Sequence, residues 1–400
     1  MAARTKALIN PALITWARET AGFSVAEAAS RLGISGEQLS AWETKDKEDA
    51  PSIPQLRKIA ALFRRPLAAF FLAEAPTRFE VMRDLRRLPG TGLRHFSPAL
   101  QIEIRSSNER RELARELASD LDEPIKLFEL AAKITDDPEV VGSKIRKSLG
   151  VTKELQFRWK DADGRAAFNG WRSRIEESGV LVFQATTFGS EEASGFAIAD
   201  EELPVIVVNR KDPLTRRTFS LLHEFTHLML RVSGVSELKT DVARPPEDQQ
   251  IEVFCNHVAA AALMPKENLL SEPLVVEHGP QSATWKDGEI TELARMFGTS
   301  REAVLRRLLT FGRTTQQFYA LKRAQYNSEY QTVKKREKEQ PKKDMKRNMP
   351  VETVSNLGKP LVRMLLGNYY QDRLTLSALS GFLNLKVKHI PKLEQVAGMR

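Results

Sequence analysis

The first 75 residues place apolar side chains at helical spacing, with short polar turns between them. Ser24 and Ser35 stand where helix N-caps are expected, and Gly33 interrupts the run between them. This pattern predicts helices over 11–21, 25–32, 36–43 and 54–63, then a final apolar turn over 66–72. Their apolar faces predict one core, made of Leu13, Ile14, Trp16, Ala17, Ala28, Ala29, Leu32, Leu56, Ile59, Ala60 and Phe63.

From residue 136 the pattern changes to helical segments mixed with short runs of β-branched residues. Asp212 and Pro213 predict the start of a further helix, with Asp212 as its cap and Pro213 at its first position. Short strands of this kind suit a small sheet packed on helices, and an edge of that sheet beside a cleft could hold an extended peptide. The predicted elements before that helix are helices over 138–149 and 165–178 and strands over 180–185, 196–199 and 204–208.

The later segments are mostly helical in pattern. Residues 233–249 are rich in Gly, Pro and charge, so we expect a loop that lines or covers a cleft. Two short amphipathic helices around Gly298 indicate a helical pair that closes a domain, with Leu293, Ala294, Phe297, Val304, Leu305 and Leu308 inside. A long polar helix over 314–340, a basic stretch over 334–347 and a small helical cap over 351–400 complete the chain.

Residues 76–135 predict a connector, because the stretch from Arg78 to Arg94 is basic and punctuated by Pro and Gly. A charge-rich helix then follows within 97–121, with Leu113, Leu117 and Leu121 as a thin apolar seam. Such a helix is usually a solvated spacer, and a dimerisation arm is the alternative. We find no internal repeat, no P-loop and no dinucleotide-binding fingerprint.

Composition limits the class of protein. A chain of 400 residues with 42% hydrophobic content is long enough for two or three domains with true cores. It contains no apolar run that would span a membrane and no signal-peptide core near its start. A single cysteine, Cys255, excludes an internal disulfide and fits a reducing cytoplasm, where we expect it to be a packing residue. A net charge of +9 permits contact with nucleic acid or acidic partners.

The apolar helical segment 219–230 contains the spacing His-Glu-x-x-His. His223 and His227 lie four residues apart, so one helix face can offer both imidazoles to a single metal. Glu224 lies beside them, where a carboxylate can take a proton from a metal-bound water. The chain has only six histidines, so the pattern favours a zinc hydrolase over a core helix whose histidines bond to the backbone.

A third ligand would come from a second helix, as a carboxylate or another histidine. Residues 250–265 predict that helix, which is rich in alanine and ends at Pro265. Glu252 and Asn256 are four residues apart, so both can face the first helix while the alanines allow close packing. Asn256 could hydrogen-bond a ligand or orient the helix pair.

These two helices resemble the ImmA/IrrE metallopeptidases, whose H-E-x-x-H helix is followed by E-x-x-[AC]-N-x-[FV]-A-x-x-x-L-M-P. Residues 252–265 match each specified position of that second pattern. The resemblance implies a gluzincin-like site in which His223, His227 and Glu252 bind Zn²⁺. It makes Glu224 the general base of a zinc metalloendopeptidase. It also implies a protein substrate, often an XRE-type repressor, whose cleavage switches on stress or mobile-element genes.

The N-terminal segment resembles the XRE/Cro-type helix-turn-helix domain, because residues 33–35 and 39–43 match its turn and recognition helix. The resemblance implies contact with double-stranded DNA through Ser35, Gln38 and Ser40. Residues 82–86 are similar to the segment that follows such a domain in the same family.

Two positions depart from the helix-turn-helix pattern. Val25 stands where glutamine is common, and Thr44-Lys45 stands where a pair ending in glycine is usual. Both positions bear on how the domain would contact phosphates. The alternative is a helical bundle that recognises protein.

We therefore expect a mainly α, multi-domain chain. The predicted parts are a five-helix XRE-type bundle (1–75), a basic linker and charged connector (76–135), an α+β metallopeptidase domain with a small sheet (136–312) and a helical C-terminal extension (313–400). The expected function is site-specific cleavage of a repressor or antitoxin-like partner. The alternatives are a DNA-binding regulator whose metal site is structural or sensory, and an antitoxin-like interaction module. A homodimer is a further expectation.

Overall fold

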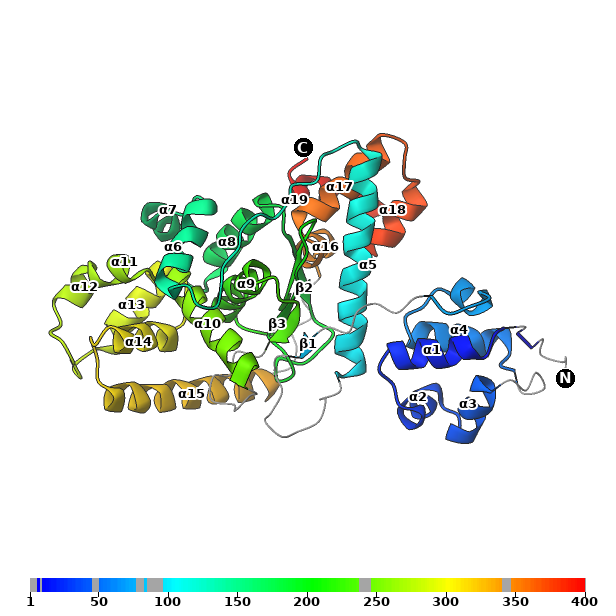
Figure 1. Ribbon diagram of the computed structural model, residues 1–400, viewed down its shortest axis with the longest axis horizontal. Helices are drawn as coiled ribbons and strands as arrows, with labels where there is room; N and C mark the ends of the chain where they lie inside the picture. Colours follow the sequence, from blue (N-terminus) through cyan, green and yellow to red (C-terminus); the bar gives the residue numbers. More distant parts are fainter. Residues whose placement is uncertain are drawn as a thin grey trace. The chain divides into compact units, whose positions relative to one another are not determined.

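The computed structural model describes residues 6–7, 9–44, 50–76, 83–84, 96–236, 246–339 and 347–399. It is mainly helical, with one small sheet (Figure 1). Two compact units emerge, the first built from residues up to 82 together with 91–109, and the second from 83–90 together with 110 onward. The predicted mainly α class is confirmed, and the bounds of the four predicted parts remain a prediction.

The first unit is the expected five-helix bundle, with a 3₁₀ helix as its last member. Ser24 caps its second helix through a capping box with Glu27, and Gly33 ends that helix in the left-handed conformation (φ 70°). Trp16 is only half-buried instead of central, and the Arg65 guanidinium carbon lies 4.1 Å from the centroid of its ring. The elements are α1 (Ala12–Thr20), α2 (Val25–Leu32), α3 (Gly36–Glu43), α4 (Ile53–Leu62) and η2 (Leu67–Phe71).

Helix α5 (Pro98–Asp120) is not the solvated spacer that its charges suggested. In the first unit, the Arg105 guanidinium donates to the carbonyl oxygens of Phe63 and Arg64 at 2.8 and 2.9 Å. In the second unit, Arg111 donates to the carbonyl of Leu203 at 3.2 Å. Arg105 and Arg111 are 5% and 9% exposed, so their aliphatic stems pack while their charged ends satisfy backbone acceptors.

The second unit contains a sheet with strand order β1-β5-β3-β4-β2. Strands β2 (Leu181–Ala185), β3 (Gly195–Ile198) and β4 (Val205–Asn209) are predicted correctly, and all their residues are buried. Strand β4 pairs with β2 in parallel and with β3 in antiparallel orientation. The sheet is therefore mixed, with buried faces.

Two short strands of this sheet were missed from the sequence. Strand β5 (Gly234–Ser236) lies in the predicted loop and pairs antiparallel with β3, and β1 (Arg83–Asp84) lies in the predicted connector and pairs with β5. Strands of two or three residues have no readable period, and only their distant partners fix them. Strand β3 is thus paired on both sides, so the outer strands of the described sheet are β1 and β2.

Helices α9 (Leu214–Met229) and α10 (Pro246–Leu263) pack against each other, and α9 also packs on β3 and β4 (Figure 1). Helix α10 begins four residues before the predicted start at Gln250. The predicted cap is wrong as well, because Pro213 itself takes the N-cap position with ψ 150° and α9 starts one residue later. Residues 237–245 of the predicted loop lie outside the described part.

Close helix packing through alanines is present, but the partner is α6 (Pro138–Ser148). A Cβ on Gly142 would lie 2.7 Å from the Cβ of Ala261, so only glycine allows this approach. Around this pair lie α7 (Lys153–Arg158), α8 (Arg165–Glu177), α11 (Lys266–Leu270), α12 (Pro273–Val276), α13 (Asp287–Phe297), α14 (Arg301–Thr310) and α15 (Gln316–Glu339). The pair α13–α14 contributes its predicted apolar residues to the core, as expected.

The C-terminal segment forms a helical group that packs on the rest of the second unit. Ser355 accepts hydrogen bonds from Arg172 and Gln184 through its carbonyl at 2.7 and 2.8 Å, and Asn368 donates to the carbonyl of Leu117 at 3.0 Å. Residues 340–346 of the basic stretch lie outside the described part. The elements are α16 (Met349–Leu357), α17 (Lys359–Tyr370), α18 (Leu376–Leu383), η3 (Val387–His389) and α19 (Ile390–Ala397).

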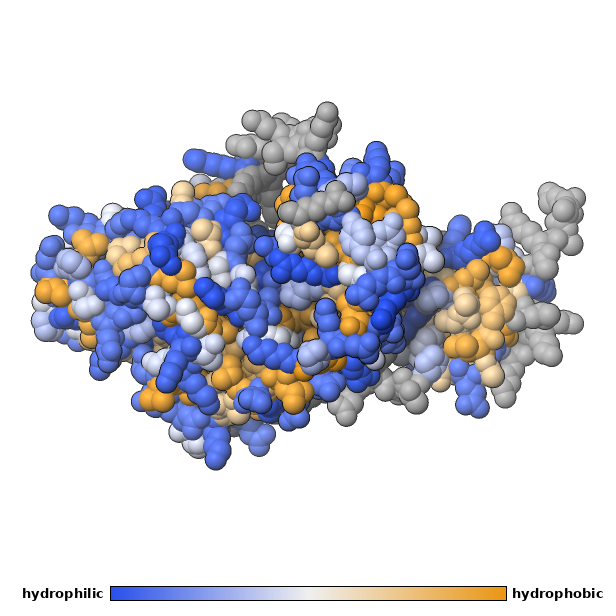
Figure 2. All heavy atoms as spheres, turned by 90° about the horizontal axis from the view of Figure 1, so that it is seen from above, coloured by the Kyte–Doolittle hydropathy of each residue, from blue (hydrophilic) through white to orange (hydrophobic). Residues whose placement is uncertain are grey.

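Among the described residues, no helix is long and apolar enough to cross a membrane. On the face drawn in Figure 2, hydrophilic residues predominate and the hydrophobic ones lie in separate groups.

Candidate metal centre

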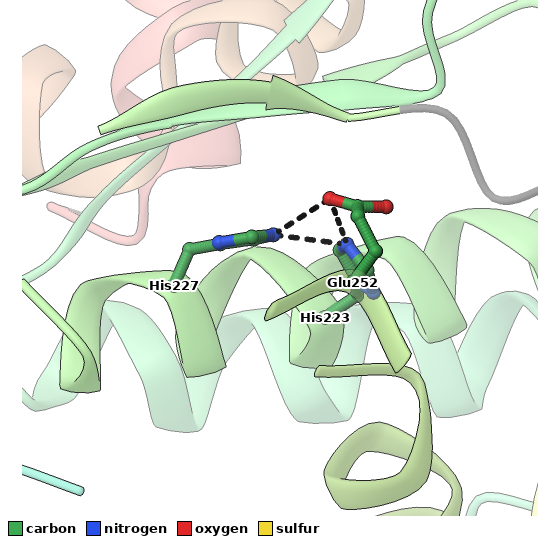
Figure 3. Close-up of side chains that lie close together, drawn as sticks. All are labelled: His223, His227 and Glu252. Atoms are coloured by element: carbon green, nitrogen blue, oxygen red, sulfur yellow. Dashed lines mark hydrogen bonds and ion pairs between the residues drawn. The ribbon is translucent and has the colours of Figure 1, made fainter. Parts of the chain in front are cut away.

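Three side chains of α9 and α10 meet in the interior of the second unit (Figure 3). The Nε2 atoms of His223 and His227 are 3.1 Å apart. The Oε1 atom of Glu252 lies 3.7 Å from the first and 3.3 Å from the second. All three side chains are fully buried, so the spacing read from two separate sequence segments converges at one point.

These distances fit a single metal ion. In a tetrahedral site with ligands at about 2.0–2.2 Å, neighbouring ligand atoms lie about 3.3–3.5 Å apart. The three separations of 3.1, 3.3 and 3.7 Å bracket that value. Two imidazole nitrogens and one carboxylate oxygen form a donor set that suits zinc and leave a fourth position for water or substrate.

Asn256 lies within hydrogen-bonding distance of one imidazole. Its Oδ1 atom lies 3.1 Å from Nδ1 of His223, and an amide oxygen can only accept, so Nδ1 carries the proton. The other ring nitrogen of His223, Nε2, lies toward Glu252 and His227. Asn256 thus contacts His223 from the same helix that carries Glu252.

The protonation states also suit a metal. Burial lowers the pKa of His227, so its imidazole is neutral near pH 7. Burial by itself raises the pKa of Glu252. The electrostatic interactions and hydrogen bonds with the His223 and His227 rings have a larger combined effect in the opposite direction, so the pKa is lowered to about 2. A neutral imidazole beside an ionised carboxylate is the form in which both bind a cation.

Glu224 lies on α9 beside the cluster of His223, His227 and Glu252, and against strand β3. A Cβ built on Gly195 would be 3.1 Å from Oε1 of Glu224 and 2.5 Å from the carbonyl oxygen of Val207. Glycine therefore lets the β3 backbone approach the Glu224 carboxylate. This contribution of Gly195 was missed from the sequence, where a glycine at the start of an apolar strand was the available signal of a close backbone approach.

Two neighbouring residues on α10 are not part of the donor set. Burial, followed by the charges of Glu252 and Glu224, raises the pKa of the Cys255 thiol, which therefore stays protonated. Its full burial agrees with the predicted packing role. His257 is exposed on the opposite side of the helix, and it does not join the three ligands.

The residues predicted to contact DNA are exposed positions at the start of α3 and along it. Ser35, Gln38 and Ser40 are all exposed, and the Ser35 hydroxyl accepts from the backbone N–H of Gln38 at 3.1 Å. Ser35 thus caps α3, which leaves its hydroxyl already bonded within the protein. Glu43, at the end of α3, pairs with Arg18 at 2.7 Å. Lys45 of the second departure lies outside the described residues.

Sequence comparisons agree with both segments. A model of the IrrE N-terminal-like domain matches residues 175–309, and a helix-turn-helix model matches residues 14–70. The radiation response metalloprotease IrrE of Deinococcus deserti is 34% identical over 110 residues, which is 26% of this chain and 36% of that protein. The chain therefore matches about a third of the length of this relative. It carries a peptidase domain of the IrrE type behind an N-terminal helix-turn-helix domain, as its motifs predicted.

Proposed function

We propose that this chain, which carries an IrrE-type domain, is a zinc-dependent endopeptidase that regulates transcription by site-specific cleavage of a protein partner. The observation that carries the proposal is the convergence of His223, His227 and Glu252 with Glu224 directly beside them. A metal site with a structural role needs four protein ligands, whereas this cluster offers three. The arrangement suits hydrolysis.

The metal would be held by the two Nε2 atoms and the Glu252 carboxylate. When bound, zinc would lower the pKa of a coordinated water toward about 7 and polarise the scissile carbonyl. Glu224 would accept the proton of that water and then donate it to the leaving amine. Asn256 would hold His223 in the tautomer that exposes its lone pair. Gly195 would keep the β3 backbone close to the Glu224 carboxylate.

The substrate class follows from the combination of domains. A helix-turn-helix domain on the same chain would bring the peptidase to DNA, where transcription factors are bound. A repressor of the XRE type or an antitoxin-like regulator would then be cut in place. The printed name of the relative, a radiation response metalloprotease, supports a role in a stress response. The lone cysteine and the DNA-binding type of domain favour a cytoplasmic location.

The competing proposal is a DNA-binding regulator or antitoxin whose metal site is structural or sensory. Such a protein needs the three ligands but has no use for a buried carboxylate at Glu224. Glu224 is fully buried beside His223 and His227, and the peptidase proposal gives this carboxylate a chemical role that the competing proposal lacks.

Elemental analysis would test the metal site. Wild type and Glu224→Gln are expected to bind about one zinc per chain, and Glu252→Ala is expected to bind far less. Zinc content unaffected by Glu252→Ala would contradict the assigned third ligand. An absence of metal after zinc loading of wild type would end the peptidase proposal.

Proteolysis would then be tested in cells of a host that expresses the chain. Mass spectrometry of new protein N-termini is expected to identify a DNA-binding regulator cut at one site by wild type and left intact by Glu224→Gln. A zinc-loaded wild type that generates no new N-termini, and instead co-purifies with an uncut partner, would favour the antitoxin-like alternative.

A further inference from the structure

The C-terminal helices repeat the backbone geometry of the N-terminal helix-turn-helix. Thr375 caps α18 by accepting from the N–H of Ala378, as Ser24 does for α2. Both capped helices have eight residues, and both end in the left-handed conformation, at Asn384 (φ 47°) and at Gly33 (φ 70°). The two turns are therefore of the same kind.

The hydrogen bonds of the two turns also match. The N–H of Leu385 donates to the carbonyl of Ser380 at 3.1 Å, and the N–H of Ile34 donates to that of Ala29 at 3.1 Å. An extended residue follows in each case, Lys386 with ψ 140° and Ser35 with ψ 155°, and a second helical segment begins after it.

A single shift in residue number also relates the buried positions of the N-terminal motif to those of the C-terminal motif. Thr375 follows Ser24 by 351 positions, and the same shift carries Ala28, Leu39 and Trp42 onto Leu379, Ile390 and Leu393. All six of these side chains are buried. The sequence shows no repeat because the two segments share few identical residues. Their capping positions and buried positions nevertheless correspond. The earlier conclusion that the chain has no internal repeat holds for the sequence and not for the structure.

The two motifs differ in charge. Residues 24–44 carry one arginine against three glutamates, a net charge of −2, whereas residues 375–398 carry three lysines against one glutamate, a net charge of +2. The shift of 351 places Lys386, Lys388 and His389 where the first motif has Ser35, Glu37 and Gln38. The basic residues thus occupy the positions that face DNA in such a motif.

The lysines are available to a ligand. Lys386, Lys388 and Lys392 are exposed, and within the described residues no ion pair or hydrogen bond engages their ammonium groups. A hollow of about 530 Å³ opens beside them, lined by Met349, Ser380, Asn384, Lys386, Lys388 and His389. In the sequence, the basic stretch that ends at Arg347 leads directly into Met349.

Helices α13 and α14 form a third motif of this kind, but two of its arginines form ion pairs within the protein. Gly298 ends α13 in the left-handed conformation, and Ser300 caps α14. In that motif Arg307 is buried against the Met264 carbonyl and pairs with Glu139 at 2.6 Å, while Arg301 pairs with Glu329 at 2.6 Å. Two arginines of this motif are therefore paired within the fold, whereas in the described part of the chain the lysines of the C-terminal motif are not, which makes the C-terminal motif the better candidate for a partner.

We propose that α18, the turn at Asn384–Leu385 and the segment 387–397 form a second helix-turn-helix surface that binds double-stranded DNA. Lysine ammonium groups act as point charges toward phosphate oxygens, so Lys386, Lys388 and Lys392 would neutralise backbone phosphates. The start of the second helical segment would face the major groove, as in other motifs of this shape. This surface is independent of the metal centre and of the DNA contacts predicted for α3.

Binding to DNA would be measured by fluorescence anisotropy with the full chain and a labelled 30-base-pair duplex of mixed sequence, over a series of KCl concentrations. In the triple variant Lys386→Ala/Lys388→Ala/Lys392→Ala we expect affinity at low salt to fall at least about tenfold. The slope of log K against log [KCl] should become shallower by about 2–3, since each lost phosphate contact removes about 0.9.

A matched control removes the same charge from exposed lysines of other elements, in Lys133→Ala/Lys147→Ala/Lys266→Ala. This control is expected to keep most of the affinity and a slope within about 1 of the wild type. Circular dichroism and zinc content would verify that both triple variants are folded. Equal losses in the two variants would show that only net charge matters and would overturn the proposal.

Two other results would also overturn it. One is a C-terminal variant that binds the duplex with wild-type affinity and slope. The other is a folded wild-type chain that does not bind the duplex at low salt, which would leave the C-terminal surface to a protein partner. Because these measurements do not involve proteolysis, their failure leaves the peptidase proposal untouched.

Discussion

Helix α9 and helix α3 both carry residues predicted to act on a partner, yet they present them in opposite ways. His223, Glu224 and His227 on α9 are fully buried, whereas Ser35, Gln38 and Ser40 on α3 are exposed. A buried ionisable group costs free energy unless it is paired or binds a metal, so its presence demands a reason. An exposed serine or glutamine demands none. The residue types by themselves therefore indicate a functional role for α9, and they do not do so for α3.

Zinc provides the largest expected contrast between the two regions. A ligand at about 1,000 times its Kd stabilises the folded state by about 4 kcal/mol, and the binding site lies in the second unit. We expect zinc to slow amide hydrogen exchange in α9 and α10 and to leave α3 unchanged, as measured by mass spectrometry. The Glu252→Ala variant is the control, and zinc-dependent protection that persists in it would place the metal elsewhere.

The Asn256 hydrogen bond should matter next. Replacing a residue that orients a metal-bound histidine typically lowers metal affinity by 10–100-fold. Asn256→Ala is expected to show such a loss in a competition titration with a chromogenic chelator. Asn256→Asp keeps an acceptor for the Nδ1–H of His223, and it should retain more affinity than the alanine variant. Equal affinity of Asn256→Ala and wild type would show that the bond has no orienting role.

A substitution at Gly195 tests how closely the β3 backbone must approach Glu224. In Gly195→Ala the new Cβ would clash with the Val207 carbonyl at 2.5 Å, so we expect a loss of about 1–3 kcal/mol in unfolding free energy. A chemical denaturation series would measure it. Gly288→Ala is the matched control, because nothing lies within 4 Å of its built Cβ and alanine favours a helix. Equal stability of the two variants would mean that β3 moves away without cost.

The smallest effects are expected on α3. Ser35→Ala removes the cap of α3 and should cost about 1 kcal/mol in stability. Ser40 is an exposed position of α3 without a capping role, so the effect of Ser40→Ala should stay within about 0.5 kcal/mol. Thermal unfolding would separate the two. A larger loss in Ser40→Ala would show that the face is packed against something, which would weaken the comparison with α9.

Local sequence signals predicted most elements of both units. The capping residues Ser24 and Ser35 and the left-handed Gly33 mark helix ends through bonds made within a few residues. The spacing of His223 and His227 predicted correctly that their imidazoles lie close together. This signal is also local, because a helix fixes the relation between residues four apart. By contrast, Asp212 and Pro213 gave a false start for α9, since a Pro after an Asp fits more than one turn geometry.

Non-local contacts explain the failures. The buried arginines of α5 have their acceptors at Phe63 and Leu203, which are 42 and 92 positions away. Strands β1 and β5 exist only through partners in other segments. The matching turns of α2–α3 and α18–α19 share caps and burial but few residue types, so no sequence pattern relates them.

The sequence by itself determined the helices, the donor types of the metal centre and the two domain kinds, because each depends on short-range spacing. Only the tertiary structure decided that Glu252 comes within 3.3 Å of His227, that Asn256 lies 3.1 Å from Nδ1 of His223 and that Gly195 lets β3 reach Glu224. It also decided that Lys386, Lys388 and Lys392 of the C-terminal motif stay exposed, whereas Arg301 and Arg307 of the α13–α14 motif form ion pairs. The physical reason is that burial and pairing are set by segments far apart in the chain, which meet only when the core forms.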